Sequence, residues 1–220
     1  MAEKIGNRQK ETPANYAKRF LEVKNHSDQL ESISIAFLTS YTAEVLNPYI
    51  SVELSKYRYY ADNYFAPFNQ FEQEVLNQKS NLYLKNPEVV ILHNMIEDMY
   101  PDMISNFSKY NDSEIELIAQ QLLDRYKAIL ETLRKQTKAS IIVINFSLLN
   151  STEDSSLYST IHQRKDQFIQ QVNKELLVLS NGISDCFNLD YMGVVLKLGV
   201  QKWIDRKKYA LLAPDQVECL

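Results

Sequence analysis

Five short strand-like segments that alternate with longer amphipathic segments constrain the fold of this 220-residue chain most strongly. The strand-like segments are mostly apolar and span residues 33–38, 59–65, 88–93, 139–145 and 183–189. Apolar residues recur at helical spacing in segments 13–30, 43–57, 68–76, 113–136 and 157–180. Strands that alternate with helices predict βαβ units. We therefore expect one α/β domain, a three-layer α/β/α sandwich with about five parallel strands.

Composition narrows the class of protein. Hydrophobic residues make up 45% and charged residues 24% of the chain, which is typical of a globular domain. The net charge is −4 without a basic stripe, which argues against nucleic-acid binding. No apolar run approaches the roughly 20 residues that span a bilayer, and the N-terminus lacks an apolar signal core. Cys186 and Cys219 form neither a disulfide framework nor a metal cluster. We expect a cytoplasmic protein with no membrane contact and no cofactor or metal in this chain.

The segment 35–42 ends the first predicted strand in a serine, Ser40, with a second hydroxyl at Thr42. In α/β proteins this junction favours developing negative charge, because backbone N–H groups and the helix dipole converge there. Ser40 is therefore a candidate nucleophile or oxyanion-binding group. The alternative is that Ser40 or Thr42 caps the following helix.

The carboxyl ends of the other strands supply further polar side chains. His93 ends the third strand and is either a base for Ser40 or a packed, hydrogen-bonded histidine. Glu97 and Asp98 either act as acid and base or cap the segment that leads to Pro101. The candidate binding residues at this edge of the sheet are Thr42, Asn69, Gln70, Glu97 and Asn145. The sequence contains no metal-ligand, dinucleotide-binding or P-loop motif.

Four segments in order, 34–51, 64–84, 86–92 and 203–214, resemble the N-terminal SGNH-like domain of FkbH-type proteins. The most specific part is Phe-Asn-Gln-Phe-x-Gln-Glu-x-Leu at 68–76. The resemblance covers roughly residues 33–214. It implies an SGNH-hydrolase or flavodoxin-like fold over 31–220, with residues 1–30 as an N-terminal helical extension.

The resemblance also implies a function for the whole protein. The family couples this domain to a haloacid-dehalogenase-like half that loads a glyceryl unit, from a phosphorylated three-carbon donor, onto an acyl carrier protein in polyketide biosynthesis. That transferase half uses a magnesium-binding Asp-x-Asp motif, which is absent from this sequence. We therefore expect magnesium only in a further half outside this chain. The implied partners are the acyl carrier protein or polyketide synthase and the downstream catalytic domain.

The resemblance can be compared with the motifs of a working SGNH hydrolase. Of the Gly-Asp-Ser-x-Thr motif, this chain keeps only the serine and the threonine, as Ser40 and Thr42. In the place of the Gly-x-Asn-Asp motif it has a segment with Glu97, whose negative charge would repel an oxyanion. Its final Asp-x-x-His motif keeps Asp205 but has Lys208 in place of the histidine. A serine without its base loses most of its nucleophilic power.

We therefore predict a non-hydrolytic domain with a docking or structural role, which leaves open whether this chain is itself an enzyme. Basic pairs at 164–165 and 207–208 are candidate contacts for an acidic carrier protein. One alternative is an active serine hydrolase or acyltransferase that uses Ser40 with His93 as its base. Another is a protein-interaction module that presents the tyrosines of segment 57–64.

Overall fold

The computed structural model describes residues 12–147 and 160–198 and contains a five-stranded sheet. All neighbouring strands are parallel, in the order β2-β1-β3-β4-β5. The strands are β1 (Glu31–Thr39), β2 (Tyr59–Phe65), β3 (Val89–His93), β4 (Ser140–Ile144) and β5 (Cys186–Leu189). The predicted α/β class and parallel sheet are confirmed, with strand ends that shift by up to three residues.

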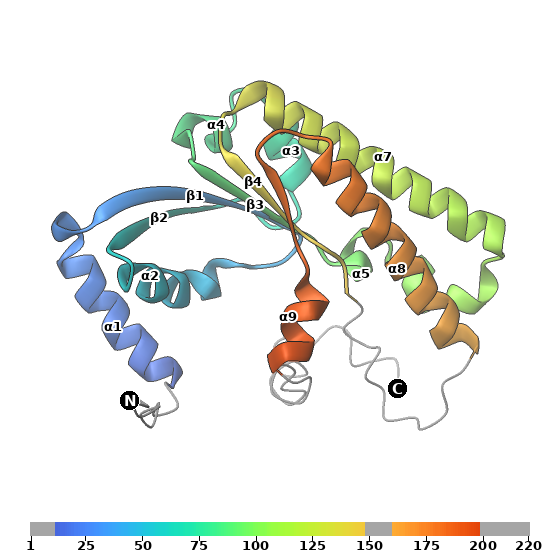
Figure 1. Ribbon diagram of the computed structural model, residues 1–220, viewed down its shortest axis with the longest axis horizontal. Coiled ribbons are helices and arrows are strands. Elements are labelled where there is room, and N and C mark those ends of the chain that lie inside the picture. Colours follow the sequence, from blue (N-terminus) through green and yellow to red (C-terminus); the bar gives the residue numbers. More distant parts are fainter. Residues whose placement is uncertain (1–11, 148–159, 199–220) are drawn as a thin grey trace, which may run out of the picture.

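Helices cover the sheet on both faces (Figure 1). On one face, α2 packs against β2 and against α1, and on the other α7 packs against α3 and α8. These helices are α1 (Pro13–Asn25), α2 (Asn47–Ser55), α3 (Phe71–Leu76), α7 (Asp112–Gln136) and α8 (Thr160–Asn181). The main hydrophobic core lies on the α7–α8 face, where Leu38, Leu92 and Val143 meet Leu130 and Leu176.

Several short elements were not predicted. Between the predicted helix 68–76 and the predicted strand 88–93 the chain forms α4 (Asn81–Lys85), and two short helices follow β3. These are α5 (Ile96–Met99) and α6 (Pro101–Ser105), and α9 (Tyr191–Leu198) follows β5. Helices of one or two turns carry too little periodicity to be recognised in the sequence.

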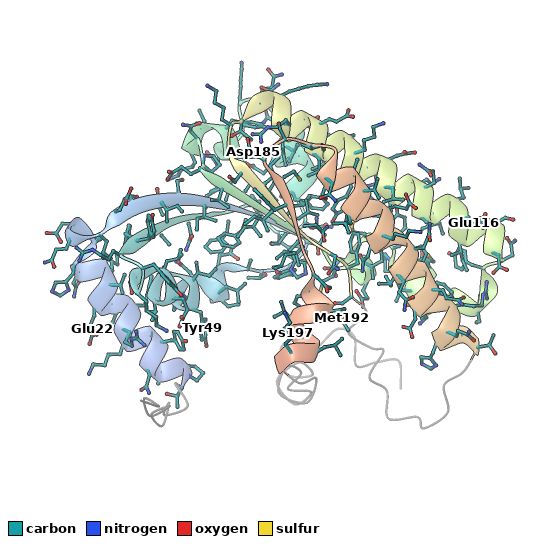
Figure 2. The ribbon with its side chains drawn as sticks, viewed as in Figure 1. Glu22, Tyr49, Glu116, Asp185, Met192 and Lys197 are labelled. Atoms are coloured by element: carbon teal, nitrogen blue, oxygen red, sulfur yellow. The ribbon has the colours of Figure 1, made fainter. Side chains whose placement is uncertain are left out.

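Helix starts also differ from the prediction. The long helix α7, predicted over 113–136, begins one residue earlier at Asp112, and its cap is Asn111. The Asn111 side chain accepts a hydrogen bond from the Glu114 amide, and the Glu114 carboxylate accepts one from the Asn111 amide. Ser113 has the same spacing to Glu116 (labelled in Figure 2), so the observed contacts of this capping box, and not the spacing, identify Asn111 as the cap. The helix predicted over 43–57 begins at Asn47, and Pro48 lies in the first turn of α2, where proline is well tolerated.

The strand order creates a crevice at one edge of the sheet. The chain leaves β1 toward β2 in one direction and returns to β3 on the other side of β1. In such sheets ligands bind where the connections diverge, at the carboxyl ends of the two strands. The residues at this point are Ser40 and Tyr41 after β1 and His93 at the end of β3. None of the described helices is long and apolar enough to cross a membrane.

Candidate functional site

Ser40 is fully buried at the end of β1 and makes two hydrogen bonds. Its hydroxyl donates to Oδ2 of Asp98 at 2.7 Å and accepts from the amide of Met95 at 2.9 Å. Both partners belong to the segment that follows β3, so Ser40 ties the ends of two neighbouring strands together. The next helix has Leu46 as its cap, so neither Ser40 nor Thr42 caps it.

His93 has different partners. Its Nδ1 lies 2.7 Å from the hydroxyl of Tyr41, and its ring lies 5.3 Å from the ring of Tyr191. Burial lowers the pKa of His93 to about 4, so the ring is neutral near pH 7. Burial, with a smaller contribution from Tyr191, raises the pKa of Tyr41 to about 12. Both phenol and imidazole are therefore uncharged, and they act as hydrogen-bonding groups.

The structure does not join Ser40 to His93. Both residues lie among those described, and no hydrogen bond connects their side chains. The proton of the Ser40 hydroxyl is directed to a carboxylate, and the His93 nitrogen nearest to that strand is occupied by Tyr41. The geometry therefore matches the packed, hydrogen-bonded histidine that the sequence offered as one alternative. A nucleophilic Ser40 stays a prediction, and no described histidine is in hydrogen-bond contact with its hydroxyl.

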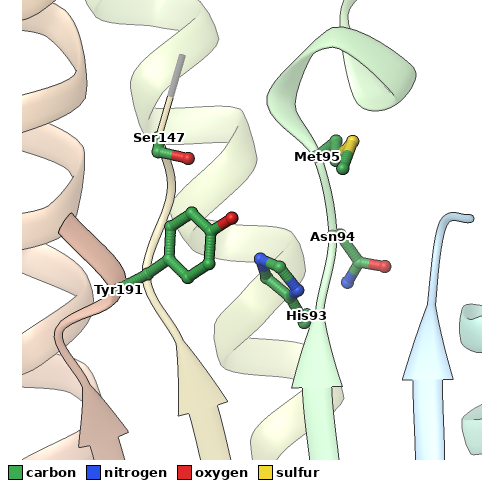
Figure 3. A pocket seen from close by; sticks show the side chains of 5 residues that line it. All are labelled: His93, Asn94, Met95, Ser147 and Tyr191. Atoms are coloured by element: carbon green, nitrogen blue, oxygen red, sulfur yellow. The ribbon is translucent and has the colours of Figure 1, made fainter. Parts of the chain in front are cut away.

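A small pocket opens beside His93 (Figure 3). Its cavity volume is about 10 Å³, room for about one water molecule, and it is lined by His93, Asn94, Met95, Ser147 and Tyr191. Figure 3 shows the Tyr191 and His93 rings side by side, with the Ser147 hydroxyl across from Met95. Such a pocket offers neutral hydrogen-bonding groups and no fixed charge. Its size suits a water molecule and not a larger ligand.

Asn145, predicted as a binding residue, positions part of this pocket. Its Nδ2 donates to Oδ1 of Asp190 at 3.1 Å, and its Oδ1 accepts from the amide of Tyr191 at 2.9 Å. Oδ1 of Asp190 also accepts from the amide of Gly193 at 3.1 Å and so caps α9. The Asn145 side chain thus fixes the start of α9 and, with it, the Tyr191 ring.

The remaining predicted residues lie away from the pocket. Asn69 and Gln70 are exposed before α3, and Thr42 is exposed after β1. Glu97 and Asp98 lie in the first turn of α5, a position that suits acidic side chains, and Asp98 binds Ser40. Asp205 lies outside the described residues.

Sequence reasoning missed Tyr41, Ser147 and Tyr191. These residues follow the ends of β1, β4 and β5, so the rule that selected Asn145, which lies just after a strand end, could also have selected them. Aromatic side chains in those places resemble core residues, so the pattern does not separate the two roles.

The segment 68–76 has a structural role. Oε2 of Glu74 accepts from the Tyr64 hydroxyl at 2.8 Å and from the amide of Leu82 at 3.1 Å. The Ser80 hydroxyl donates to the carbonyl of Glu74 at 2.7 Å, and Phe71 is buried. These contacts hold α3 against α4 and β2. The most specific stretch of the sequence therefore organises the crossover between β2 and β3.

No group of three or more His, Cys, Asp or Glu side chains within 12–147 and 160–198 is placed to hold a metal ion. The fold is that of a parallel α/β domain, and in the described part of its site the buried Ser40 is hydrogen-bonded to Asp98 and not to a histidine. The family model for the N-terminal domain of FkbH matches residues 34–213. The chain therefore belongs to the FkbH N-terminal domain family.

Two solved structures share this fold. One is the N-terminal part of the protein BF1531 from Bacteroides fragilis, which contains a phosphatase domain complexed with Mg. The match covers 87% of this chain, with 20% sequence identity and a TM-score of 0.64. The chain spans only 50% of that structure. The other is the acetyl xylan esterase AlAXEase, with 15% identity and a TM-score of 0.50, over 77% of this chain and 83% of its own. No curated protein sequence matches the chain.

Proposed function

We propose that this chain is the cytoplasmic, non-hydrolytic docking domain of an FkbH-type protein. A separate haloacid-dehalogenase-like half would transfer a glyceryl unit from a phosphorylated three-carbon donor to an acyl carrier protein in polyketide biosynthesis, and magnesium would be bound there. Family membership supports this assignment, as does the BF1531 structure, which contains a phosphatase domain and of which this chain covers 50%. The domain proposed here would hold the carrier protein beside that half.

The observation that carries the non-hydrolytic part is the hydrogen-bond pattern of Ser40. A serine nucleophile must pass its proton to a base as it attacks. Here the partner of the hydroxyl is the Asp98 carboxylate and not a histidine, and Ser40 has no accessible surface through which a substrate could reach it. The neutral His93 ring is bound to Tyr41. Ser40 therefore supports the strand ends and does not present a nucleophile.

The docking part rests on charge and on the family. Acyl carrier proteins are acidic, so a basic contact is expected on the domain. Of the pair at 164–165, Arg164 is used internally, because it donates to the carbonyl of Tyr110 at 3.0 Å and to Asp112 at 2.7 Å. Lys165 lies beside it over the ring of Phe107 and is the position to test. The pair at 207–208 lies outside the described residues.

Intact-mass measurement with a fluorophosphonate probe tests the non-hydrolytic part. We expect no adduct on the folded chain, and the same result for Ser40→Ala. A stoichiometric adduct that disappears in Ser40→Ala would overturn the proposal in favour of a serine hydrolase or acyltransferase. An active serine hydrolase labelled in parallel confirms that the probe is competent.

Titration with a holo-acyl carrier protein, followed by calorimetry, tests the docking part separately. We expect saturable binding that weakens as salt is added, because the contact is electrostatic. Lys165→Glu should weaken binding severalfold, whereas Lys174→Glu, the same charge change on an exposed position of α8, should have little effect. Absence of binding, or equal effects of both variants, would contradict docking at this surface without touching the result for Ser40.

A further inference from the structure

The end of α8 carries the only Asn-Gly pair of the chain, Asn181-Gly182. Asn181 is the last residue of α8, and both residues are exposed. In an Asn-Gly pair the backbone nitrogen of the glycine can attack the side-chain amide carbon of the asparagine. Because glycine has no Cβ, no side chain hinders the approach of these two atoms. The pair is therefore the place in this sequence where such an intramolecular reaction meets the least steric resistance.

The fold opposes this reaction through the end of the helix. The amide of Gly182 donates to the carbonyl oxygens of Val178 at 3.2 Å and of Leu179 at 3.1 Å. The Gly182 nitrogen must lose its proton and turn toward the Asn181 side chain before it can attack, so both hydrogen bonds have to break first. The terminal turns of helices open with a much smaller free-energy cost than helix interiors. Opening of this one turn is therefore enough to expose the pair to the reaction.

We propose that Asn181 is a site of spontaneous deamidation, and that opening of the last turn of α8 sets its rate. This inference is independent of the function proposed above. The Gly182 nitrogen bonds to the side-chain carbonyl carbon of Asn181, and its proton passes through solvent to the amide nitrogen, which leaves as ammonia. Water then opens the cyclic succinimide at either of its two carbonyl groups, which gives aspartate or isoaspartate at this position. The solvent supplies that water, so the reaction requires no cofactor.

The product disturbs the connection from α8 to β5. A new carboxylate at this position puts negative charge at the C-terminal end of a 22-residue helix, where the helix dipole disfavours it. Isoaspartate also lengthens the backbone by a methylene group, just before two carbonyl groups that are in use. The carbonyl of Ser184 accepts from Nη1 of Arg134 at 2.9 Å, and the carbonyl of Asp185 accepts from the amide of Ile141 at 2.8 Å. Deamidation is therefore expected to loosen β5, an edge strand, from β4.

Incubation in mildly alkaline buffer, followed by peptide mass spectrometry and an isoaspartate methyltransferase assay, tests the proposal. We expect Asn181 to convert in the folded protein, and to convert severalfold faster in urea, where the hydrogen bonds of Gly182 are absent. Gly182→Ala should slow conversion severalfold because its Cβ obstructs the attack, and this Cβ fits the fold, since it would lie 3.4 Å from the nearest atom. Asn25, the exposed last residue of α1, is the matched control. His26 follows it in place of a glycine, so Asn25 should convert severalfold more slowly than Asn181.

Three results would overturn the proposal. One is the absence of conversion at Asn181 in the folded protein over a period in which the chain in urea converts, or its absence in both conditions. Another is an equal rate in the folded protein and in urea, which would show that the end of α8 does not control the reaction. The third is an equal rate in urea for the wild type and Gly182→Ala, or for Asn181 and Asn25, which would show that the glycine does not direct it.

Discussion

Replacing His93 with glutamine should remove part of the acid sensitivity of this fold. In the folded protein burial lowers the pKa of His93 from 6.5 to about 4, with Tyr41 and Tyr191 as its neutral neighbours. The unfolded chain therefore binds more protons than the folded protein between these two values. The free energy of unfolding consequently falls as the pH drops through 6.5 toward 4, and this loss is absent above that window.

The size of the effect follows from the two pKa values. With a pKa of 6.5 in the unfolded chain and about 4 in the folded protein, the free energy of unfolding is about 2 kcal/mol lower at pH 5 than at neutral pH. Water at the mouth of the neighbouring pocket reduces this contribution, because solvent screens the charge of the protonated ring. We therefore expect a difference of about 1–2 kcal/mol between the wild type and His93→Gln over this range.

Urea unfolding at a series of pH values measures this difference directly. The carboxylates contribute equally to the pH dependence of both proteins, so subtracting the two curves isolates His93. His26→Gln, at an exposed position, serves as the matched control and should keep the wild-type slope. Parallel curves for wild type and His93→Gln would refute the buried, neutral state of this imidazole.

Two further substitutions test the packing around the site. Gly193→Ala should destabilise the protein by about 1–3 kcal/mol in thermal unfolding, because the added Cβ would lie 2.3 Å from Oδ2 of Asp190. The control Gly182→Ala should be nearly neutral, because its Cβ would lie 3.4 Å from the nearest atom. Tyr126→Phe should cost about 1–3 kcal/mol in urea unfolding, because it removes the fully buried hydroxyl that accepts from Asn94 at 3.1 Å. Adding Asn94→Leu should recover part of that loss, since both polar partners are then gone, and further destabilisation would contradict this explanation.

Much of the fold could be predicted because it depends on local patterns. The apolar run before Ser40 identifies a buried strand wherever it lies in the chain, and alternation with helices requires parallel pairing. Short helices such as α5 and α9 escaped this approach, because one or two turns do not establish a period. The start of α7 could not be fixed to the residue, since Asn111, Asp112 and Ser113 can all accept the hydrogen bond of a cap.

The sequence by itself determined the class of fold and the edge of the sheet where polar side chains gather. It identified Ser40, His93 and Asn145 as residues of that edge, because position after a strand is a property of the chain alone. Only the tertiary structure decided their partners: Asp98 for Ser40, Tyr41 for His93, and Asp190 for Asn145. These contacts join residues 45 to 58 positions apart, so they depend on how the crossovers bring strand ends together. For that reason Ser40, whose place in the sequence suits a nucleophile, is in the folded protein a buried residue that links two strand ends by hydrogen bonds.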